Sequence, residues 1–249
     1  MRKFLTACSV LLFLSAQSQF SVGMKGGISI PRLKGNNEKS EGYTSRLGIY
    51  GGVQAIFPLS HTLSLQPEVN FSPQGGQRKG MQPIPSDAID GIMLPPGVVL
   101  YANFKNTAIL NYLEIPVLLK LAFERRSKLT YYACFGPHIA FLLEAKTKTS
   151  GKSSLFLDKE STMPLTQNGT LFPPVDFNST TDIKESIKKV NAGIQGGVGI
   201  EHPIGNGNIF FDARAIIGML NIQTHPEEDG KNKTGSFMLA IGYSLIINK

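Results

Sequence analysis

The sequence predicts an all-β fold: an eight-stranded antiparallel up-and-down transmembrane β-barrel with short periplasmic turns and long extracellular loops. Eight segments alternate between apolar and polar residues, and each is 11 to 15 residues long. A strand that crosses a bilayer at a tilt needs about 9–11 residues, whereas a globular strand usually has about 5–6. The connections between the segments are alternately short and long, an asymmetry that is typical of membrane barrels of bacteria.

Residues 1–18 are predicted to be a secretory signal peptide. A positively charged start precedes the apolar run Phe4–Leu14, which is shorter than the roughly 20 residues that a membrane helix needs. The small residues of Ala16–Ser18 provide a cleavage site, so that residues 19–249 form one barrel domain. A lipoprotein signal ending at Cys8 is the alternative, but the apolar run continues beyond this cysteine.

The eight predicted strands follow one another along the chain, and helical periodicity is nearly absent. They span Phe20–Ile30, Arg46–Phe57, Thr62–Gln74, Ile109–Phe123, Leu129–Leu143, Lys189–His202, Asn208–Met219 and Gly235–Ile247. Tight turns are expected at Pro58–His61, Glu124–Lys128 and Pro203–Gly207, and long loops at residues 31–45, 75–108, 144–188 and 220–234. Turns and loops therefore lie at opposite ends of the sheet, and the even number of strands places both chain ends beside the turns.

The two faces of the strands differ in chemistry. In the second strand, one face carries Leu47, Ile49 and Val53, while the other carries glycines and a charge. A soluble barrel would turn the apolar face inward, and a membrane barrel would turn it outward. The glycines favour the membrane barrel, because the lumen of eight strands is tight and a small residue leaves room for a large neighbour. Aromatic residues near the strand ends also favour it: Phe71, Phe141 and Phe237 on the loop side, and Phe57, Phe123, Tyr131, Phe211 and Tyr243 on the turn side.

The charged residues of the polar face are the candidate site. They form a predicted lumen salt-bridge network of Lys25, Arg46, Glu68, Glu114, Lys120, Glu201, Asp212 and Arg214. Burying one such charge alone would cost several kcal/mol, so the four cations and four anions are expected to pair and plug the lumen. Glu68 is expected to pair with Arg214, Lys25 or Arg46. Beside it, Pro67 lacks an N–H group and should cause a bulge or a locally broken strand ladder. An ion path through the lumen is the alternative.

The sequence favours a protein that is not an enzyme and that uses no metal or other cofactor. Cys134 is the one cysteine after the predicted signal peptide, which excludes an internal disulfide and a thiol metal cluster. Cys134 and His138 share the lumen face, but no third catalytic group or nucleophile motif accompanies them. The histidine spacings match no metal-site pattern.

The composition limits the partners. Only 17% of the residues are charged, against about 25% in a soluble domain. The net charge of +7 is spread along the chain, so we expect no nucleic-acid partner. Lys146, Lys148 and Lys152 in one long loop are candidates for contacts with anionic lipid head groups. A monomer in contact with outer-membrane lipids and lipopolysaccharide is therefore expected.

Five segments carry a resemblance to a known family. They are Gly48–Val53, Leu65–Ser72 followed by Gly75 and Gly76, Asn111–Lys120, Tyr132–Pro137 and Gly197–Glu201. Their order and their spread over nearly the whole mature chain resemble the PorT-like outer-membrane β-barrel family of Bacteroidota. The resemblance implies a multi-pass barrel in the bacterial outer membrane. Because PorT itself is implicated in type IX protein secretion, it also implies an envelope or secretion-machinery protein as a partner.

Together these observations predict a small non-enzymatic outer-membrane barrel with a charge-plugged lumen. Its long loops would act as a membrane anchor or binding scaffold, because loops on a rigid frame often carry binding. Two alternatives remain open at this point: a narrow porin-like pore for small solutes, and an accessory component of type IX secretion.

Overall fold

The structure is a computed structural model that describes residues 20–36, 42–85, 89, 95, 98–123, 129–167 and 169–247. The predicted signal peptide, residues 1–18, and the predicted turn at 124–128 lie outside the described residues.

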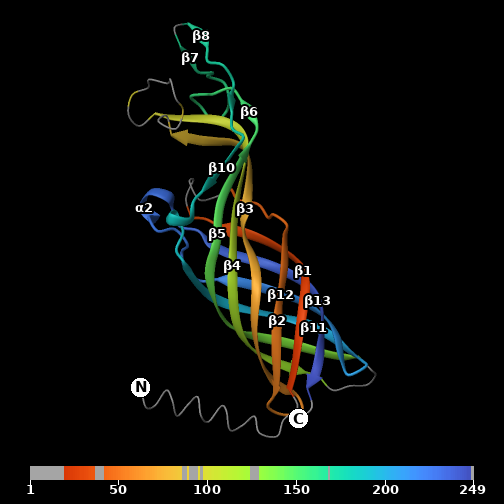
Figure 1. Ribbon diagram of the computed structural model, residues 1–249. Helices are drawn as coiled ribbons and strands as arrows, with labels where there is room; N and C mark the ends of the chain where they lie inside the picture. Colours follow the sequence, from red (N-terminus) through yellow and green to blue (C-terminus); the bar gives the residue numbers. More distant parts are fainter. Residues whose placement is uncertain are drawn as a thin grey trace, which may run out of the picture.

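Within the described residues, eight long antiparallel strands form a closed ring (Figure 1). They are β1 (Phe20–Lys34), β2 (Gly48–Pro58), β3 (Leu63–Pro85), β4 (Val99–Ala122), β5 (Thr130–Ser150), β11 (Val190–Ile204), β12 (Gly207–Gly218) and β13 (Lys233–Ile247). Each strand pairs with its neighbour along the chain, β5 pairs with β11, and β13 returns to β1. The predicted up-and-down barrel is therefore confirmed.

The remaining elements are short. They are β6 (Lys152–Ser153), β7 (Thr166–Gln167), β8 (Thr170–Leu171), β9 (Val175–Asp176), β10 (Ser179–Asp182), the 3-10 turn η2 (Lys184–Ser186) and the helix α2 (Pro226–Asp229). No helix among the described residues is long and apolar enough to cross a membrane.

The tight turns of the described residues lie at the end of the barrel where β1 begins and β13 ends. Phe20 is the register partner of Ile247, and the two-residue turn at Gly205–Asn206 opens at the same end. Gly205 has a φ of 59°, a backbone conformation that glycine adopts without a steric cost. The long connections lie at the opposite end, as predicted.

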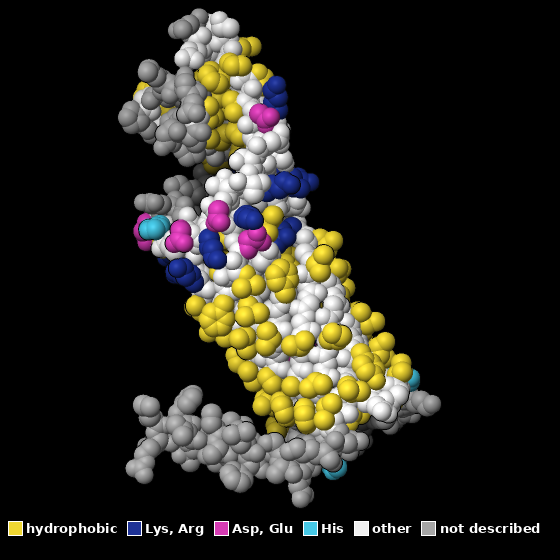
Figure 2. All heavy atoms as spheres, in the orientation of Figure 1, with side chains coloured by type: hydrophobic (Ala, Val, Ile, Leu, Met, Phe, Trp, Pro, Cys, Tyr) yellow, Lys and Arg dark blue, Asp and Glu magenta, His cyan; other side chains and the backbone are white. Residues whose placement is uncertain are grey.

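Side chains alternate between the lumen and the outer wall along each barrel strand. On β13, Phe237, Ile241 and Leu245 are exposed, whereas Met238 and Ala240 are buried. Apolar side chains of this outward kind form a broad band on the face of the barrel seen in Figure 2, and every barrel strand has such exposed apolar residues. A water-facing surface rarely exposes so large a continuous apolar area, so the band is suited to the hydrocarbon of a bilayer.

Two of the predicted loops are wrong in part, because three strands continue far beyond the apolar band. β3 and β4 remain paired up to Pro85 and Val99, inside the predicted loop 75–108, and β5 runs to Ser150, inside the predicted loop 144–188. The outward residues of these continuations include Lys79 and Lys105, which face water instead of lipid. The apolar alternation that identifies a membrane strand is therefore lost where the surrounding medium changes.

The ladder of β3 is interrupted beside Pro67, as the sequence predicts. Its pairs with β2 pass from Gln54–Glu68 to Phe57–Leu65, and its pairs with β4 pass from Pro67–Val117 to Asn70–Glu114. The register is the same on both sides of each gap. Proline cannot donate to the ladder: Pro67 lies in the gap toward β2, whereas in the gap toward β4 it stays paired with Val117 and Pro116 of β4 is the proline that faces the unpaired Glu68.

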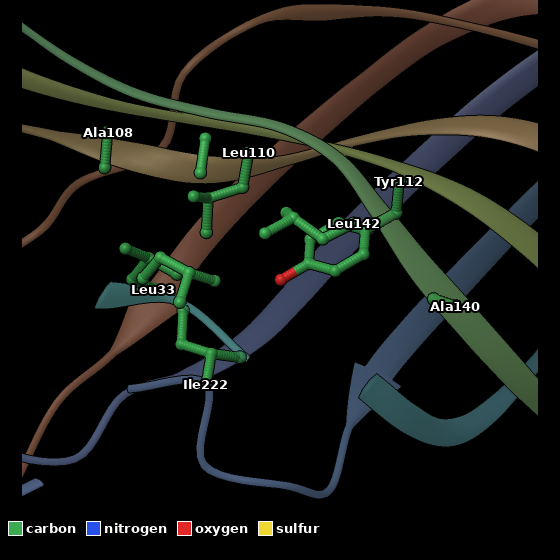
Figure 3. Close-up of a cluster of buried hydrophobic side chains, with 9 residues drawn as sticks. Leu33, Ala108, Leu110, Tyr112, Ala140, Leu142 and Ile222 are labelled. Atoms are coloured by element: carbon green, nitrogen blue, oxygen red, sulfur yellow. The ribbon is translucent and has the colours of Figure 1, made fainter. Parts of the chain in front are cut away.

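Two apolar clusters lie at the long-loop end. The mouth cluster consists of Leu33, Ala108, Leu110, Tyr112, Ala140, Leu142, Ala145, Ile187 and Ile222. Ile187 and Ile222 belong to the connections that follow β10 and β12, and Figure 3 shows Leu33 and Ile222 beside side chains of β4 and β5. Backbone hydrogen bonds hold the connections there, since the Lys188 N–H donates to the Ile222 carbonyl at 2.7 Å. The long connections thus cover the opening of the barrel.

The extension cluster lies farther out. We call residues 77–85, 99–107 and 150–177, as far as they are described, the extension. Its buried core consists of Ile84, Leu100, Ala102, Leu155 and Leu165. Phe104 stacks on Phe177 with ring centroids 4.7 Å apart, and Tyr101 and Phe156 exchange two backbone hydrogen bonds of 2.8 and 2.9 Å. The extension therefore has a core of its own outside the barrel (Figure 1).

Candidate functional site in the barrel lumen

Four charged side chains meet inside the barrel. Lys25 of β1 lies 2.7 Å from Glu68 of β3, measured from Nζ to Oε2. Arg214 Nη1 lies 3.0 Å from each oxygen of Glu68, and Arg214 Nη2 also bonds Asp212. Lys25 Nζ is 3.7 Å from Asp212 Oδ2. All four side chains are 0% exposed, and their two positive and two negative charges cancel. We call this group the central cluster.

Uncharged side chains complete the hydrogen bonding of the central cluster. Gln66 donates to Glu68 Oε1 at 2.7 Å, and Asn70 donates to Glu68 Oε2 at 2.9 Å. The Tyr132 hydroxyl donates to Asp212 Oδ1. Each carboxylate oxygen therefore has at least one donor, which a buried ion needs because desolvation costs several kcal/mol per charge.

Glycines on β11 make room for these large side chains. Gly197 is the register partner of Arg214, and a Cβ atom at position 197 would collide with the Ala213 carbonyl oxygen and lie 2.7 Å from the Arg214 Cγ. Gly199 is the partner of Asp212, and a Cβ atom there would collide with the hydroxyl of Tyr132. The glycine-rich lumen face of the sequence therefore has a steric cause.

A second ion pair lies nearer the turn end. Lys120 Nζ is 2.6 Å from Glu201 Oε2, and both side chains are mostly buried. Lys120 Nζ also lies 4.1 Å from the centroid of the Tyr132 ring. Tyr132 thus touches both groups, with its hydroxyl on Asp212 and its ring beneath Lys120. This contact adds a cation–π attraction to the ion pair.

The structure does not join all eight predicted residues in one network. Arg46 lies near the barrel mouth, where Nε and Nη2 donate to the Gln74 carbonyl at 3.1 and 2.7 Å. It is six residues away from Gly52, the register partner of Lys25, which is about 20 Å along a strand at 3.4 Å per residue. Glu114 is buried and accepts from Gln195 at 3.0 Å, and no cation among the described residues lies within 4.0 Å of it.

Sequence reasoning did not predict the three uncharged side chains that donate hydrogen bonds to the central cluster. Gln66 and Asn70 belong to the predicted lumen face of β3, but neutral amides were not expected to bind the ions. Tyr132 shares the lumen face of β5 with Cys134, so the same alternation identifies its direction. The signal that could have found all three is their position within two residues of a lumen charge or on a facing strand.

The described residues give no further support to a catalytic or metal centre. Cys134 is a free, buried thiol, and His138 is buried four residues further along the same face. No hydrogen bond joins the two side chains in the described part of the chain. No group of three or more His, Cys, Asp or Glu side chains suited to a metal ion occurs there either.

A closed ring of antiparallel strands with an apolar outer band and a buried charge cluster defines a transmembrane β-barrel. The chain belongs to the family described as outer membrane protein beta-barrel domain, whose family model matches residues 15–223. It is therefore an outer-membrane protein, as predicted. The match is to the wide domain family, and it does not distinguish PorT-like members within it.

Solved structures similar to this chain are outer-membrane barrels of low sequence identity. Neisserial surface protein A shares 12% identity over 92% of this chain and 97% of its own, with a TM-score of 0.42. OprG from Pseudomonas aeruginosa shares 10% identity over 94% and 99%, with a TM-score of 0.40. Ail, the attachment invasion locus protein of Yersinia pestis, shares 13% identity over 92% and 99%, with a TM-score of 0.34. No curated protein sequence matches this chain significantly.

Proposed function

We propose that this protein is a closed, non-enzymatic outer-membrane barrel that anchors a folded binding module outside the cell. One observation carries the proposal: the lumen is filled at two levels while three strands continue beyond it. The central cluster fills the middle, the mouth cluster fills the long-loop end, and the extension has its own core.

The closure is expected to be stable. An eight-stranded barrel is only wide enough for side chains to fill its interior. A path through it would have to separate Glu68 from Lys25 and Arg214, and each uncompensated buried charge would cost several kcal/mol. It would also have to move Ile187 and Ile222 away from the mouth cluster.

The extension has the features of a binding scaffold. Paired backbones and a buried core hold its shape, since Leu100 and Leu155 are almost completely buried there. Rigid elements position contact residues more accurately than free loops do. The apolar band would contact membrane lipids, including the acyl chains of lipopolysaccharide, and the barrel would act as a monomer.

Solute uptake into proteoliposomes tests the closed-lumen part of the proposal. Liposomes that contain the refolded protein should swell no faster in a small sugar or amino acid than protein-free liposomes. The pore alternative is favoured by the buried polar atoms Tyr50 Oη, His138 Nδ1 and Arg214 Nε, which have no hydrogen-bond partner among the described residues. Swelling that increases with the amount of folded protein would support the pore and contradict the proposal.

The accessory role in type IX secretion rests on the family resemblance alone. It requires a stable envelope partner. Affinity capture of the full chain from cross-linked outer membranes should recover the barrel by itself under our proposal. Stoichiometric recovery of a secretion component would favour the accessory role instead.

A further inference from the structure

A basic pocket opens on the outer side of the extension. Its volume is about 670 Å³, and its lining includes Lys79, Lys105 and Lys152 together with four serines, among them Ser150 and Ser161. Charged side chains gather beyond the apolar band in Figure 2, on the side that leads to the extension, with Lys and Arg interspersed among Asp and Glu. The pocket is separate from the lumen, because Lys79 and Lys105 lie on the strand face that continues the outer wall.

The register of the strands places like charges together in this pocket. Lys79 is directly opposite Lys105, and Lys105 is directly opposite Ser150. Like charges directly opposite each other destabilise an antiparallel pair. No carboxylate among the described residues lies within 4.0 Å of the three ammonium groups. The arrangement weakens the fold unless an anion compensates it.

One carboxylate lies on the strand that pairs with the pocket residue Lys152. Asp176 is the register partner of Lys152 in the β6–β9 pair. Its carboxylate accepts from the Asn178 N–H at 2.8 Å and does not line the pocket. Lys152 therefore lines the pocket with no carboxylate of the described residues within 4.0 Å of its ammonium group.

The walls of the pocket contain unusual backbone conformations. Gly80 and Gly151 have φ values of 102° and 133°, and Ser161 has a φ of 62°. Ser161 is the one residue other than glycine with positive φ in the described part of the chain. The Asp158 carboxylate fixes its turn by accepting from the Thr162 N–H at 2.9 Å and from the Met163 N–H at 2.7 Å. Glycine adopts such conformations freely, so Ser161 is the strained residue of this wall, and strained residues often occur where ligands bind.

We propose that this pocket binds a phosphorylated saccharide. The proposal rests on the proposed function, because it names the ligand class of the extension. Ammonium groups suit phosphate as point charges, serine hydroxyls can bond sugar hydroxyls, and Phe156 offers an aromatic surface in the same lining. The volume lies within the range of small-molecule sites, about 300–1,000 Å³, and is far larger than one phosphate needs.

The position of the pocket fits a ligand outside the hydrocarbon. The Lys79–Lys105 pair is four residues beyond the Gly75–Ile109 pair, which is about 13 Å along the strands at 3.3 Å per residue. A phosphorylated saccharide could come from two sources at this height. It could be the head group of a lipopolysaccharide in the same membrane, or it could be a free sugar phosphate.

Calorimetric titration of the full chain in detergent with glucose 1,6-bisphosphate tests the proposal. The wild type should bind this probe and should bind glucose at least about tenfold more weakly, because hydrogen bonds to charged groups are the stronger ones. The triple variant Lys79→Gln, Lys105→Gln, Lys152→Gln should lose at least about tenfold in affinity for the same reason. The control Lys159→Gln, Lys188→Gln, Lys189→Gln removes three exposed charges outside the pocket and should keep the wild-type affinity.

Absence of binding to the wild type, or an equal loss in both triple variants, would overturn the proposal. Folding of each variant is checked by heat-modifiable migration in gels. The pocket triple should also melt no lower than the wild type, because it relieves the Lys79–Lys105 repulsion. A folded, closed barrel that fails to bind the probe would refute the pocket alone, whereas solute flux would refute the proposed closure alone.

The same titration in lipid nanodiscs assigns the source of the saccharide. Discs that contain lipopolysaccharide are compared with discs of phosphatidylcholine only. If the lipopolysaccharide head group occupies the pocket, it competes with the probe, so the wild type should bind the probe more weakly in the lipopolysaccharide discs. The pocket triple variant should show no such difference between the two kinds of disc. This result assigns the pocket to the lipid head group. Equal probe binding in both kinds of disc assigns it to a free sugar phosphate.

Discussion

Glu68 holds the central cluster together at the residue scale. It accepts from Lys25, from Arg214 and from two side-chain amides, and it is fully buried. Without its charge, Lys25 and Arg214 would share the single carboxylate of Asp212 in a medium of low dielectric constant. Removing one partner of a buried pair is more costly than removing the whole pair.

The variant Glu68→Gln should lower the free energy of unfolding by about 3–5 kcal/mol. Denaturant or thermal unfolding of the purified protein in detergent measures this loss. Glu144→Gln is the control, since its partner Lys146 is 2.6 Å away but both side chains are about two-fifths exposed. An exposed pair of this kind contributes about 0–1 kcal/mol. Equal effects of the two variants would contradict a buried, charge-coupled cluster.

Gly197→Ala should destabilise the barrel because its methyl group would collide with the Ala213 carbonyl oxygen and press on Arg214. Overpacking of a filled interior typically costs about 1–3 kcal/mol. Gly26→Ala is the matched control, because a Cβ atom at position 26 on the outer wall meets no atom within 4 Å. Melting temperatures of the two variants in the same detergent test the comparison. A larger loss for Gly26→Ala would show that the lumen glycine is not there to make room.

Alternation along the strands was sufficient to predict the direction of each lumen charge, but not its partners. The alternation of side chains along β1, β3 and β12 places Lys25, Glu68 and Arg214 in the lumen, and in the structure Glu68 forms ion pairs with both cations. Partners depend on the height of each residue in the barrel, and this height follows from the stagger and tilt of the strands. Arg46 was therefore placed in the network by direction although its height separates it from the cluster, and Glu114, the register partner of Asn70, hydrogen-bonds Gln195 rather than a cation.

The extension is the feature of interest at the scale of elements. Its core is separated from the mouth cluster, and its strands are continuous with β3, β4 and β5. A part with its own buried core can open locally while the rest of the protein stays folded. Local stability of the extension can therefore be tested independently of the barrel.

Leu155→Ala should loosen the extension and leave the barrel folded. Leu155 is almost completely buried, and a buried Leu→Ala change costs about 2–5 kcal/mol. Limited proteolysis should cleave residues 151–177 faster, while heat-modifiable migration stays at the wild-type temperature. Leu171→Ala in the same segment is the control, because this leucine is 64% exposed. Joint loss of the barrel in Leu155→Ala would mean that the two parts unfold as one unit.

The sequence allowed the eight barrel strands to be predicted in order, because lipid demands an uncharged outer face over a long run. The same criterion missed the outer parts of β3, β4 and β5. There the outward residues meet water and become polar, as Lys79 and Lys105 do. The mouth cluster was missed for another reason: it joins Leu33, Tyr112 and Ile222 from distant parts of the chain, which no local pattern records.

Under the proposed function, the whole molecule is a barrel with a closed interior that carries its binding part outside the membrane. Charge balance in the central cluster and apolar packing at the mouth oppose the entry of ions by two different physical means. Both closures would have to open together for an ion to pass. A closed lumen is therefore the central claim, and it can be examined without knowledge of any ligand.

Conductance across planar lipid bilayers measures this claim most directly. The wild-type protein, folded as judged by heat-modifiable migration and recovered from the bilayer in folded form, should produce no stable single-channel steps. The reason is that no continuous water path can pass the central cluster while Glu68 remains paired with Lys25 and Arg214. Reproducible single-channel steps of uniform size from the folded wild type would contradict a closed lumen.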